Sequence, residues 1–411
     1  MININTDVTI IGAGPGGLAS AVSAKLNGAK KVIVLDRNNW LGGILPQCIH
    51  DGFGVEELGK SLTGPEYADL YITEARKNNI EFLTETMVLN LNKNLEITAV
   101  SKKGLLNIKS QSIILAMGCR EKTRWDIMIP GDRPSGIFTA GVAQSFNNLY
   151  NIRIGKKILI LGSGDVGLIM ARRLKFEGLD VLGVVEILPY GSGLPRNIVQ
   201  CLDDFGIPLF LNHTLTEIIG RERLESVKIA EVDKKFNVIE GTEKEISCDT
   251  LLLSIGLIPE NELSKEAKIK IDKKTGGPVV NQFFETSIPG IFACGNCLQV
   301  YDTVDALSKD AKTAGRFAAI KKRNKLNREI KVIPGNTISY VIPQKIDNSC
   351  KVHFSLRVKK PIEKPIIKVK SKGTKLYSKQ LRFAIPANMI EFDMDIDLDE
   401  IYKTLEVSIS D

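Results

Sequence analysis

A strand, a glycine-rich turn, a helix, a second strand and an acidic residue follow one another near the start of the chain. The apolar stretch Asp7–Ile11 runs into Gly12–Gly17, then into the small-residue stretch Leu18–Leu26, and Lys31–Leu35 ends at Asp36. In such a unit the glycines permit a tight turn, close backbone approach to a pyrophosphate, and close packing of helix on strand. The pyrophosphate lies on free N–H groups at the helix N-terminus, where the helix dipole favours negative charge. The order of residues therefore predicts a dinucleotide site in which Asp36 accepts hydrogen bonds from a ribose.

The same pattern occurs a second time. Lys157–Leu161 runs into Gly162–Gly167, Leu168–Glu177 has helical character, and Val181–Val185 ends at Glu186. The first glycine and the acid are 24 positions apart in both copies, from 12 to 36 and from 162 to 186. One glycine motif is weak evidence, but two with matching flanks predict two dinucleotide sites.

The second acid also predicts which nucleotide binds. Glu186 has no arginine among the next nine residues. A carboxylate at this place accepts a hydrogen bond from a ribose 2′-hydroxyl and repels a 2′-phosphate. We therefore expect NADH rather than NADPH, with Arg196 leaving the alternative open.

Length and composition limit the remaining choices. At 411 residues, with 43% hydrophobic and 25% charged residues, the chain has the make-up of a folded protein of two or three domains. We expect no membrane span, because no apolar run reaches the roughly 20 residues that a bilayer requires. The start of the chain lacks a signal peptide pattern, and the seven cysteines are scattered. Both features favour the cytoplasm.

The net charge of +7 is unevenly distributed along the chain: 321–382 carries 18 basic and 3 acidic residues, and 383–411 carries 1 basic and 8 acidic residues. A basic region can attract nucleic acid, anionic lipid or an acidic partner. We favour a solvated face, and we expect no nucleic-acid binding because the first 320 residues have a net charge of only −1.

These motifs resemble the pyridine nucleotide–disulfide oxidoreductase superfamily of flavoproteins. Ser112–Gly118 and Thr250–Pro259 resemble the strands that close its FAD and NAD domains, and Pro289–Asn296 resembles its second FAD fingerprint. The family usually has aspartate where this chain has Asn296, so the expected contact with the flavin ribityl chain is a hydrogen bond without a charge. The resemblance implies an α/β fold with two Rossmann-like domains, the NAD domain (121–256) being inserted in the FAD domain (1–120 and 257–328), plus a small C-terminal β-sandwich-like domain (329–411).

The resemblance also assigns cofactor residues. Those expected at FAD are Gly12, Gly14, Pro15, Gly16, Gly17, Asp36, Arg37, Gly42, Gly43, Ile44, Gln47, Val88, Ala116, Gly118, Gly295, Asn296 and Thr303. Those expected at NAD(H) are Gly162, Gly164, Asp165, Val166, Gly167, Glu186 and Gly256. We expect no metal site.

A narrower resemblance concerns partners. Gly42–Gly54, Met117–Glu121, Gly136–Gln144 and Tyr340–Gln344 are similar to one bacterial branch. That branch includes NAD/FAD subunits of dye-linked proline and opine dehydrogenases, sarcosine oxidase α chains and flavoproteins of glycerol-3-phosphate operons. It implies electron transfer with a partner redox flavoprotein, a small cysteine-bearing electron carrier, or both; an oligomer is possible.

The cysteines argue against a disulfide reductase. One class of dithiol reductase has Cys-x4-Cys after the FAD acid, where this chain has Cys48 alone. The other has Cys-x2-Cys in the NAD domain, where Cys201 and Cys248 are 47 positions apart. A dithiol relay needs a second thiol, so we expect none. Cys294 and Cys297 do have Cys-x2-Cys spacing, but we favour a packing role beneath the flavin.

Two side chains are candidate catalytic residues. Cys48 is expected beside the flavin, where a single thiol could cycle through sulfenic acid, and His50 could donate a proton. The function expected first is hydride transfer between NADH and FAD, with electrons exchanged with a partner. The alternatives are a self-contained NADH oxidase or peroxidase that uses Cys48, and a flavin-bound scaffold without turnover.

The C-terminal residues alternate between apolar and polar, which predicts antiparallel strands. Examples are Val352–Val358, Ile367–Lys370 and Met394–Leu398. If the strand bearing Lys368, Lys370 and Lys372 pairs with the strand bearing Asp393, Asp395 and Asp397, the two form a ladder of opposite charges. This domain is expected to dock a partner or to cover the FAD domain.

Overall fold

The computed structural model describes residues 2–320 and 329–410. The chain forms two compact units, one of Met1–Cys119 with Pro259–Asp411 and one of Arg120–Ile258. The α/β fold class is confirmed, whereas the assignment of nucleotides to domains 1–120 with 257–328, and 121–256, stays a prediction. Residues 321–328, which belong to the expected FAD domain and to the basic region, lie outside the described residues.

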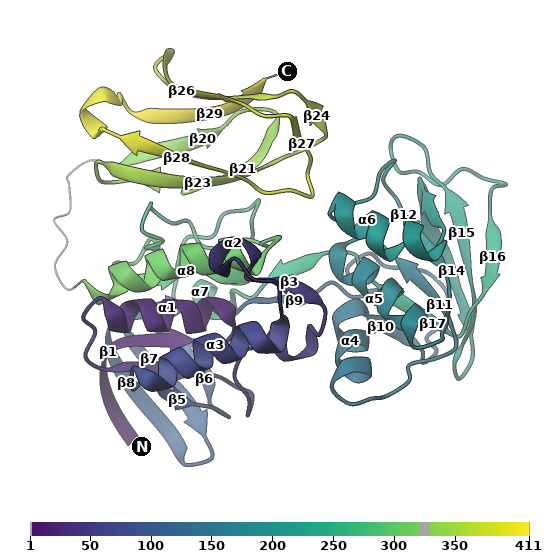
Figure 1. The fold of residues 1–411 in the computed structure, drawn as a ribbon, viewed down its shortest axis with the longest axis horizontal. Helices are drawn as coiled ribbons and strands as arrows, with labels where there is room; N and C mark the ends of the chain where they lie inside the picture. The colour runs from purple at the N-terminus through teal and green to yellow at the C-terminus, as the bar shows by residue number, and fades with distance from the viewer. Residues whose placement is uncertain (1, 321–328, 411) are drawn as a thin grey trace. The chain divides into compact units, whose positions relative to one another are not determined.

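The first unit contains a seven-stranded sheet, shown in Figure 1. Its strands are β5 (Glu81–Leu83), β2 (Val32–Leu35), β1 (Ile2–Ile11), β8 (Gly104–Leu115), β7 (Glu96–Ser101) and β6 (Met87–Leu91), with β19 (Ile291–Ala293) also pairing β8. Strands β5, β2, β1, β8 and β19 are parallel, and β6 to β8 form an antiparallel meander. β1 begins five residues earlier than the expected Asp7, because Ile2–Thr6 pair with Leu106–Ser110.

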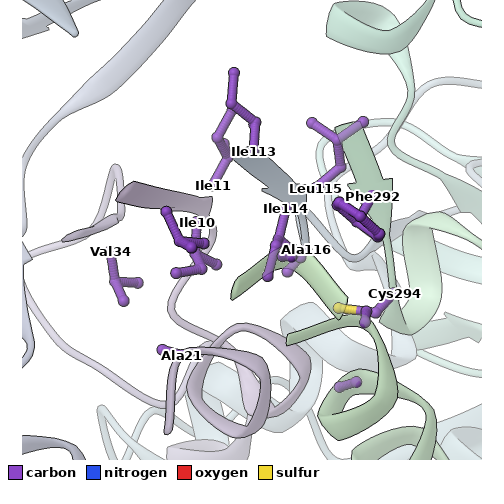
Figure 2. Packing of buried hydrophobic residues seen from close by; sticks show 14 of the residues in the cluster. Ile10, Ile11, Ala21, Val34, Ile113, Ile114, Leu115, Ala116, Phe292 and Cys294 are labelled. Atoms are coloured by element: carbon purple, nitrogen blue, oxygen red, sulfur yellow. The ribbon is translucent and has the colours of Figure 1, made fainter. Parts of the chain in front are cut away.

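Three helices accompany this sheet: α1 (Pro15–Leu26), α3 (Gly64–Lys77) and α8 (Val304–Ala319). α1 and α8 approach closely, since a Cβ on Gly315 would lie 2.1 Å from the carbonyl oxygen of Ser20. The small residues of α1 allow this approach, and burial of their apolar atoms stabilises it. Figure 2 shows the core, in which Ile10, Ile114 and Phe292 come from β1, β8 and β19.

The second unit has a parallel five-stranded sheet. Its order is β10 (Ile137–Thr139), β17 (Thr250–Leu253), β11 (Lys157–Leu161), β12 (Asp180–Glu186) and β13 (Leu209–Leu211). Its helices are α4 (Ala140–Asn148), α5 (Asp165–Phe176) and α6 (Pro195–Cys201), and a meander follows: β14 (His213–Gly220), β15 (Leu224–Glu231) and β16 (Lys244–Ser247). The expected strand Lys157–Leu161 is thus confirmed, and both nucleotide motifs lie between parallel strands.

Two larger sheets form the core of the C-terminal segment, beside the two-stranded pair of β24 (Ile362–Glu363) and β27 (Phe383–Ala384). One has the order β22 (Lys345–Ile346), β20 (Ile330–Pro334), β29 (Thr404–Ser410), β25 (Ile366–Ser371) and β26 (Thr374–Gln380). The other has the order β21 (Ile338–Ile342), β23 (Cys350–Val358) and β28 (Ile390–Ile396). Buried residues of both sheets, among them Phe354, Val369 and Val407, share one core. The segment is therefore the expected β-sandwich.

The strands that would form a ladder of opposite charges do not pair. The strand of Lys368 and Lys370, β25, pairs with β26 and β29. The strand of Asp393 and Asp395, β28, pairs with β23 in the other sheet, where Asp393 lies opposite His353. Alternation specifies which face of a strand is buried but not which strand is its neighbour.

None of the helices formed by residues 2–320 and 329–410 is long and apolar enough to cross a membrane.

Candidate functional site

The first glycine turn requires glycine at its two ends. Gly12 follows β1 with φ +107°, and a Cβ there would lie 2.3 Å from the carbonyl oxygen of Ala116. A Cβ on Gly17 would lie 1.8 Å from the carbonyl oxygen of Gly12. The turn therefore packs tightly against the residue that follows β8, and α1 begins within the turn, at Pro15.

Three backbone segments converge at the N-terminus of α1. A Cβ on Gly43 would lie 2.8 Å from the Cα of Gly14, and a Cβ on Gly16 would lie 3.5 Å from the Cα of Gly295. Pro15 occupies the first turn of α1, and no acidic residue lies in that turn. Free backbone N–H groups at a helix start, with no acidic side chain from the first turn beside them, suit an anion. The residues at this end of α1 thus fit the pyrophosphate of a dinucleotide.

The acid of the first motif is fixed to the turn. Asp36 is buried at the end of β2, and its Oδ2 accepts a hydrogen bond from the N–H of Ala13 at 2.7 Å. Its Oδ1 accepts one from the N–H of Asn38 at 2.8 Å. Arg37 beside it is exposed, and Val88 is buried on β6. Asp36 therefore holds the shape of the turn besides facing the expected ribose position.

The second motif repeats this arrangement. Oε2 of the buried Glu186 accepts a hydrogen bond from the N–H of Ser163 at 3.0 Å, and Oε1 accepts one from the N–H of Leu188 at 3.0 Å. The hydroxyl of Ser192 also donates to Oε2, at 2.9 Å. The acid and the residue after the first glycine are 23 positions apart in both motifs.

Ser254 closes the second turn and was missed by the sequence analysis. A Cβ on Gly162 would lie 2.2 Å from its carbonyl oxygen, and its Oγ accepts a hydrogen bond from the N–H of Gly167 at 3.1 Å. Ser254 directly follows β17, as Ala116 directly follows β8. The place after the closing strand was the signal that could have identified it.

The other residues expected at the second nucleotide have varied surroundings. Asp165 begins α5, and its Oδ1 accepts hydrogen bonds from the N–H of Leu194 at 2.8 Å and from Nδ2 of Asn197 at 2.7 Å. Val166 is half-buried in the same turn, and Gly256 has φ +108°. Asp165 thus links the start of α5 to the start of α6, and its Oδ1 already accepts two hydrogen bonds.

The second FAD fingerprint leads from β19 into α8. Asn296 Oδ1 accepts a hydrogen bond from the N–H of Tyr301 at 3.1 Å, and Asn296 Nδ2 lies 3.6 Å from Sγ of Cys119. Thr303 caps α8 by accepting from the N–H of Ala306 at 3.3 Å. Asn296 is therefore held by its own loop.

The segment with the candidate catalytic residues passes the first turn. The N–H of Gly42 donates to the carbonyl oxygen of Ala13 at 2.9 Å. Ile44 is exposed, and Gln47 and Cys48 are half-buried. Burial raises the pKa of the Cys48 thiol to about 12, so the thiolate is scarce at neutral pH. The ring of His50 lies against Phe53, with ring centroids 5.1 Å apart.

The Cys294–Cys297 pair belongs to the core. Both side chains are fully buried, and burial raises the pKa of each thiol. Sγ of Cys297 contacts the carbonyl oxygen of Leu115 at 3.2 Å, and Figure 2 shows Cys294 among the packed side chains. These contacts agree with the expected packing role. Within residues 2–320 and 329–410, no group of three or more His, Cys, Asp or Glu side chains is arranged to hold a metal ion.

Comparison with known proteins gives one family match, to the model described as pyridine nucleotide-disulphide oxidoreductase, over residues 6–316. An NADH oxidase of Methanocaldococcus jannaschii is 30% identical over 373 residues, covering 85% of this chain and 77% of that protein. A sarcosine oxidase subunit alpha of Corynebacterium is 24% identical over 337 residues, covering 77% of this chain but only 33% of its own length.

Among solved structures, a thioredoxin reductase of T. acidophilum has a TM-score of 0.63 at 24% identity. The match covers 76% of this chain and 96% of that one. At this identity the likeness concerns the fold alone.

Proposed function

Because the chain belongs to the pyridine nucleotide-disulphide oxidoreductase family and is an NAD(P)H- and FAD-dependent oxidoreductase, we propose that it moves a hydride between NADH and FAD and exchanges electrons with a partner redox protein. No dithiol relay takes part. FAD supplies the ring that accepts or gives the hydride. The protein binds and orients both nucleotides and excludes water.

The observation that carries the proposal is the repeated tie between acid and glycine turn. Asp36 fixes the first turn through Ala13, and Glu186 fixes the second through Ser163. We assign FAD to the first because Gly43 and Gly295 approach its helix from two further segments. Gly295 belongs to the stretch that resembles the second FAD fingerprint, so that stretch lies beside the first turn.

The choice of NADH follows from Glu186. Its buried carboxylate lies where the ribose of a dinucleotide is expected, and a 2′-phosphate there would meet a like charge. The hydroxyls of Ser163 and Ser192 already donate to it. A ribose 2′-hydroxyl would donate to the Glu186 carboxylate beside these two hydroxyls or in place of one of them. A 2′-phosphate at neutral pH would bring negative charge and acceptor oxygens but no donor.

The protonation and burial of the thiols support electron transfer without a dithiol relay. None of the cysteines, all of which lie within the described residues, forms a disulfide. The pKa of Cys48 is about 12, and Cys294 and Cys297 are shielded from solvent. Free thiols also suit a reducing compartment, which supports a cytoplasmic location.

A protein partner is supported by the relative named as a subunit, sarcosine oxidase subunit alpha. We propose a second redox flavoprotein or a small cysteine-bearing carrier as that partner. The relative named NADH oxidase favours a second candidate function, in which oxygen accepts the electrons directly.

Rapid mixing separates these functions. FAD-loaded protein is mixed with NADH without oxygen, and then with air. Under the proposed function, the flavin absorbance falls rapidly when NADH is added and returns slowly in air. The absorbance returns faster when an artificial one-electron acceptor is added. Fast turnover on air alone would favour the oxidase, and an NADH complex that no acceptor reoxidises would favour the scaffold.

A further inference from the structure

Residues 297–303 join the second FAD fingerprint to α8, and the C-terminal sandwich holds them. Nε2 of Gln299 donates to Oγ of Ser355 on β23 at 2.9 Å. The carbonyl oxygen of Val300 accepts from Arg357, also on β23, at 3.0 Å. The carboxylate of Asp302 accepts from Arg357 and from the N–H of Met389. The loop that shapes the surroundings of Asn296 thus depends on contacts from outside the FAD domain.

Arg357 uses all five of its N–H donors. Nε donates to the hydroxyl of Tyr340 at 3.0 Å, and one terminal nitrogen donates to the carbonyl oxygens of Pro386 and Ala387, both at 2.8 Å. The other terminal nitrogen serves Val300 and Asp302. A guanidinium is a rigid planar fork, so saturating it fixes the relative places of every group it binds.

A second anchor lies nearly two turns into α8. The hydroxyl of Tyr301 donates to Oδ2 of the buried Asp310 at 2.6 Å. Nε2 of His353, on β23, lies 3.9 Å from Oδ1 of Asp310 and 2.9 Å from Oε1 of Glu391. Tyr301 therefore contacts Asn296 through its backbone N–H and the sandwich through Asp310.

We propose that the C-terminal sandwich is part of the flavin site, with Arg357 and Asp310 as positioning residues that hold residues 297–303 and thereby Asn296. This inference rests on the proposed function, because it takes Asn296 as an FAD contact. The sandwich thus serves the cofactor through residues 297–303, in contrast to a separate partner-docking domain. Loss of Arg357 frees the Val300 carbonyl and leaves the carboxylate of Asp302 without its cation, so the loop loosens.

The test compares Arg357→Gln with Arg382→Gln, which changes an exposed arginine of the same segment. FAD affinity of the flavin-free full chain is measured by fluorescence quenching. We expect Arg357→Gln to raise the FAD Kd roughly tenfold or more. The FAD Kd of Arg382→Gln, and the NADH Kd of both variants, should stay within about twofold of wild type. Hydrogen exchange of the Tyr301 amide, read without cofactor, should quicken only in Arg357→Gln.

Arg357→Lys keeps the positive charge but has three N–H donors instead of five. Its FAD Kd and its Tyr301 amide exchange should lie between those of wild type and Arg357→Gln, so the inference stays testable if Arg357→Gln fails to fold. An unchanged FAD Kd and unchanged amide exchange in both Arg357 variants would overturn the inference alone. A wild-type chain that does not bind FAD would overturn the proposed function, and the amide exchange would still show whether Arg357 holds the loop.

Discussion

The Oδ2 atom of Asp36 accepts a hydrogen bond from the backbone N–H of Ala13 at 2.7 Å, so the last residue of the first motif fixes the glycine turn at its start. Glu186 and Ser163 repeat the relationship in the second motif. Each acid therefore shapes its glycine turn, and under the proposed function that turn receives a pyrophosphate while the acid lies near the ribose.

Asp36→Asn removes the charge and leaves one oxygen to accept two N–H groups. A hydrogen bond to a charged group contributes roughly 1.5–3 kcal/mol, so we expect FAD affinity to fall by about 10- to 100-fold. Affinity for NADH should not change. Equilibrium titration with each nucleotide checks this, and Asp69→Asn, an exposed carboxylate on α3, is the matched control. Equal FAD affinity in Asp36→Asn and wild type would contradict the role of Asp36.

Glu186→Gln tests the choice of nicotinamide nucleotide. Wild type should bind NADH at least roughly tenfold more tightly than NADPH, because the 2′-phosphate meets a carboxylate. The variant should narrow this ratio by improving NADPH binding. Calorimetric titration of both nucleotides gives the ratio, with Glu240→Gln as an exposed control in the same unit. Tighter binding of NADPH than of NADH by wild type would reject the expectation.

Cys48→Ser should leave electron transfer intact. With a thiol pKa of about 12, Cys48 is protonated at neutral pH and is a poor nucleophile toward peroxide. We expect flavin reduction by NADH and turnover with a one-electron acceptor to stay within about twofold of wild type. Peroxide-dependent NADH consumption is the discriminating assay. If wild type consumes peroxide rapidly and Cys48→Ser does not, the peroxidase alternative replaces the proposed function.

The contact between α8 and the sandwich should weaken as pH rises. Burial raises the pKa of Asp310 to about 6, against the opposing charge of His353, so folding favours its protonated form. Burial lowers the pKa of His353, but Glu391, Asp310 and Asp393 outweigh burial and raise it overall, while Lys309 opposes them. The pKa values of Asp310 and His353 are thus higher in the folded chain than in the unfolded chain. The free energy by which each protonated group stabilises the fold is therefore fully present at low pH. It is lost as pH rises through about 6 for Asp310 and above 6.5 for His353.

Thermal unfolding of wild type and Asp310→Asn across this range measures the effect. The asparagine does not titrate but can still accept from Tyr301, so the fall in Tm between pH 4 and pH 6 should be shallower in the variant. Identical slopes would show that Asp310 does not titrate as described.

The sequence was sufficient for the parts that depend on local pattern. Glycine spacing and the acids at 36 and 186 predicted both turns, because only glycine tolerates the backbone approaches at Gly12 and Gly162. Alternation predicted the C-terminal strands. It did not predict their order. Whether the Lys368 and Asp393 strands pair was left open, and they do not, because each finds its neighbours through long-range packing.

Arg357 shows what the sequence could not provide. It occupies one polar place in an alternating strand, and its partners Tyr340, Val300 and Asp302 come from separate parts of the chain. A buried cation is recognisable only when the acceptors around it are known. Ser254 differs, since its place directly after a closing strand could have been compared with that of Ala116.

Anaerobic titration of the FAD-loaded chain with NADH tests the central claim most directly. The account predicts that the visible absorbance of bound FAD disappears on addition of about one equivalent of NADH, since a hydride carries both electrons that FAD accepts. Bound FAD that keeps its absorbance through an excess of NADH would contradict it.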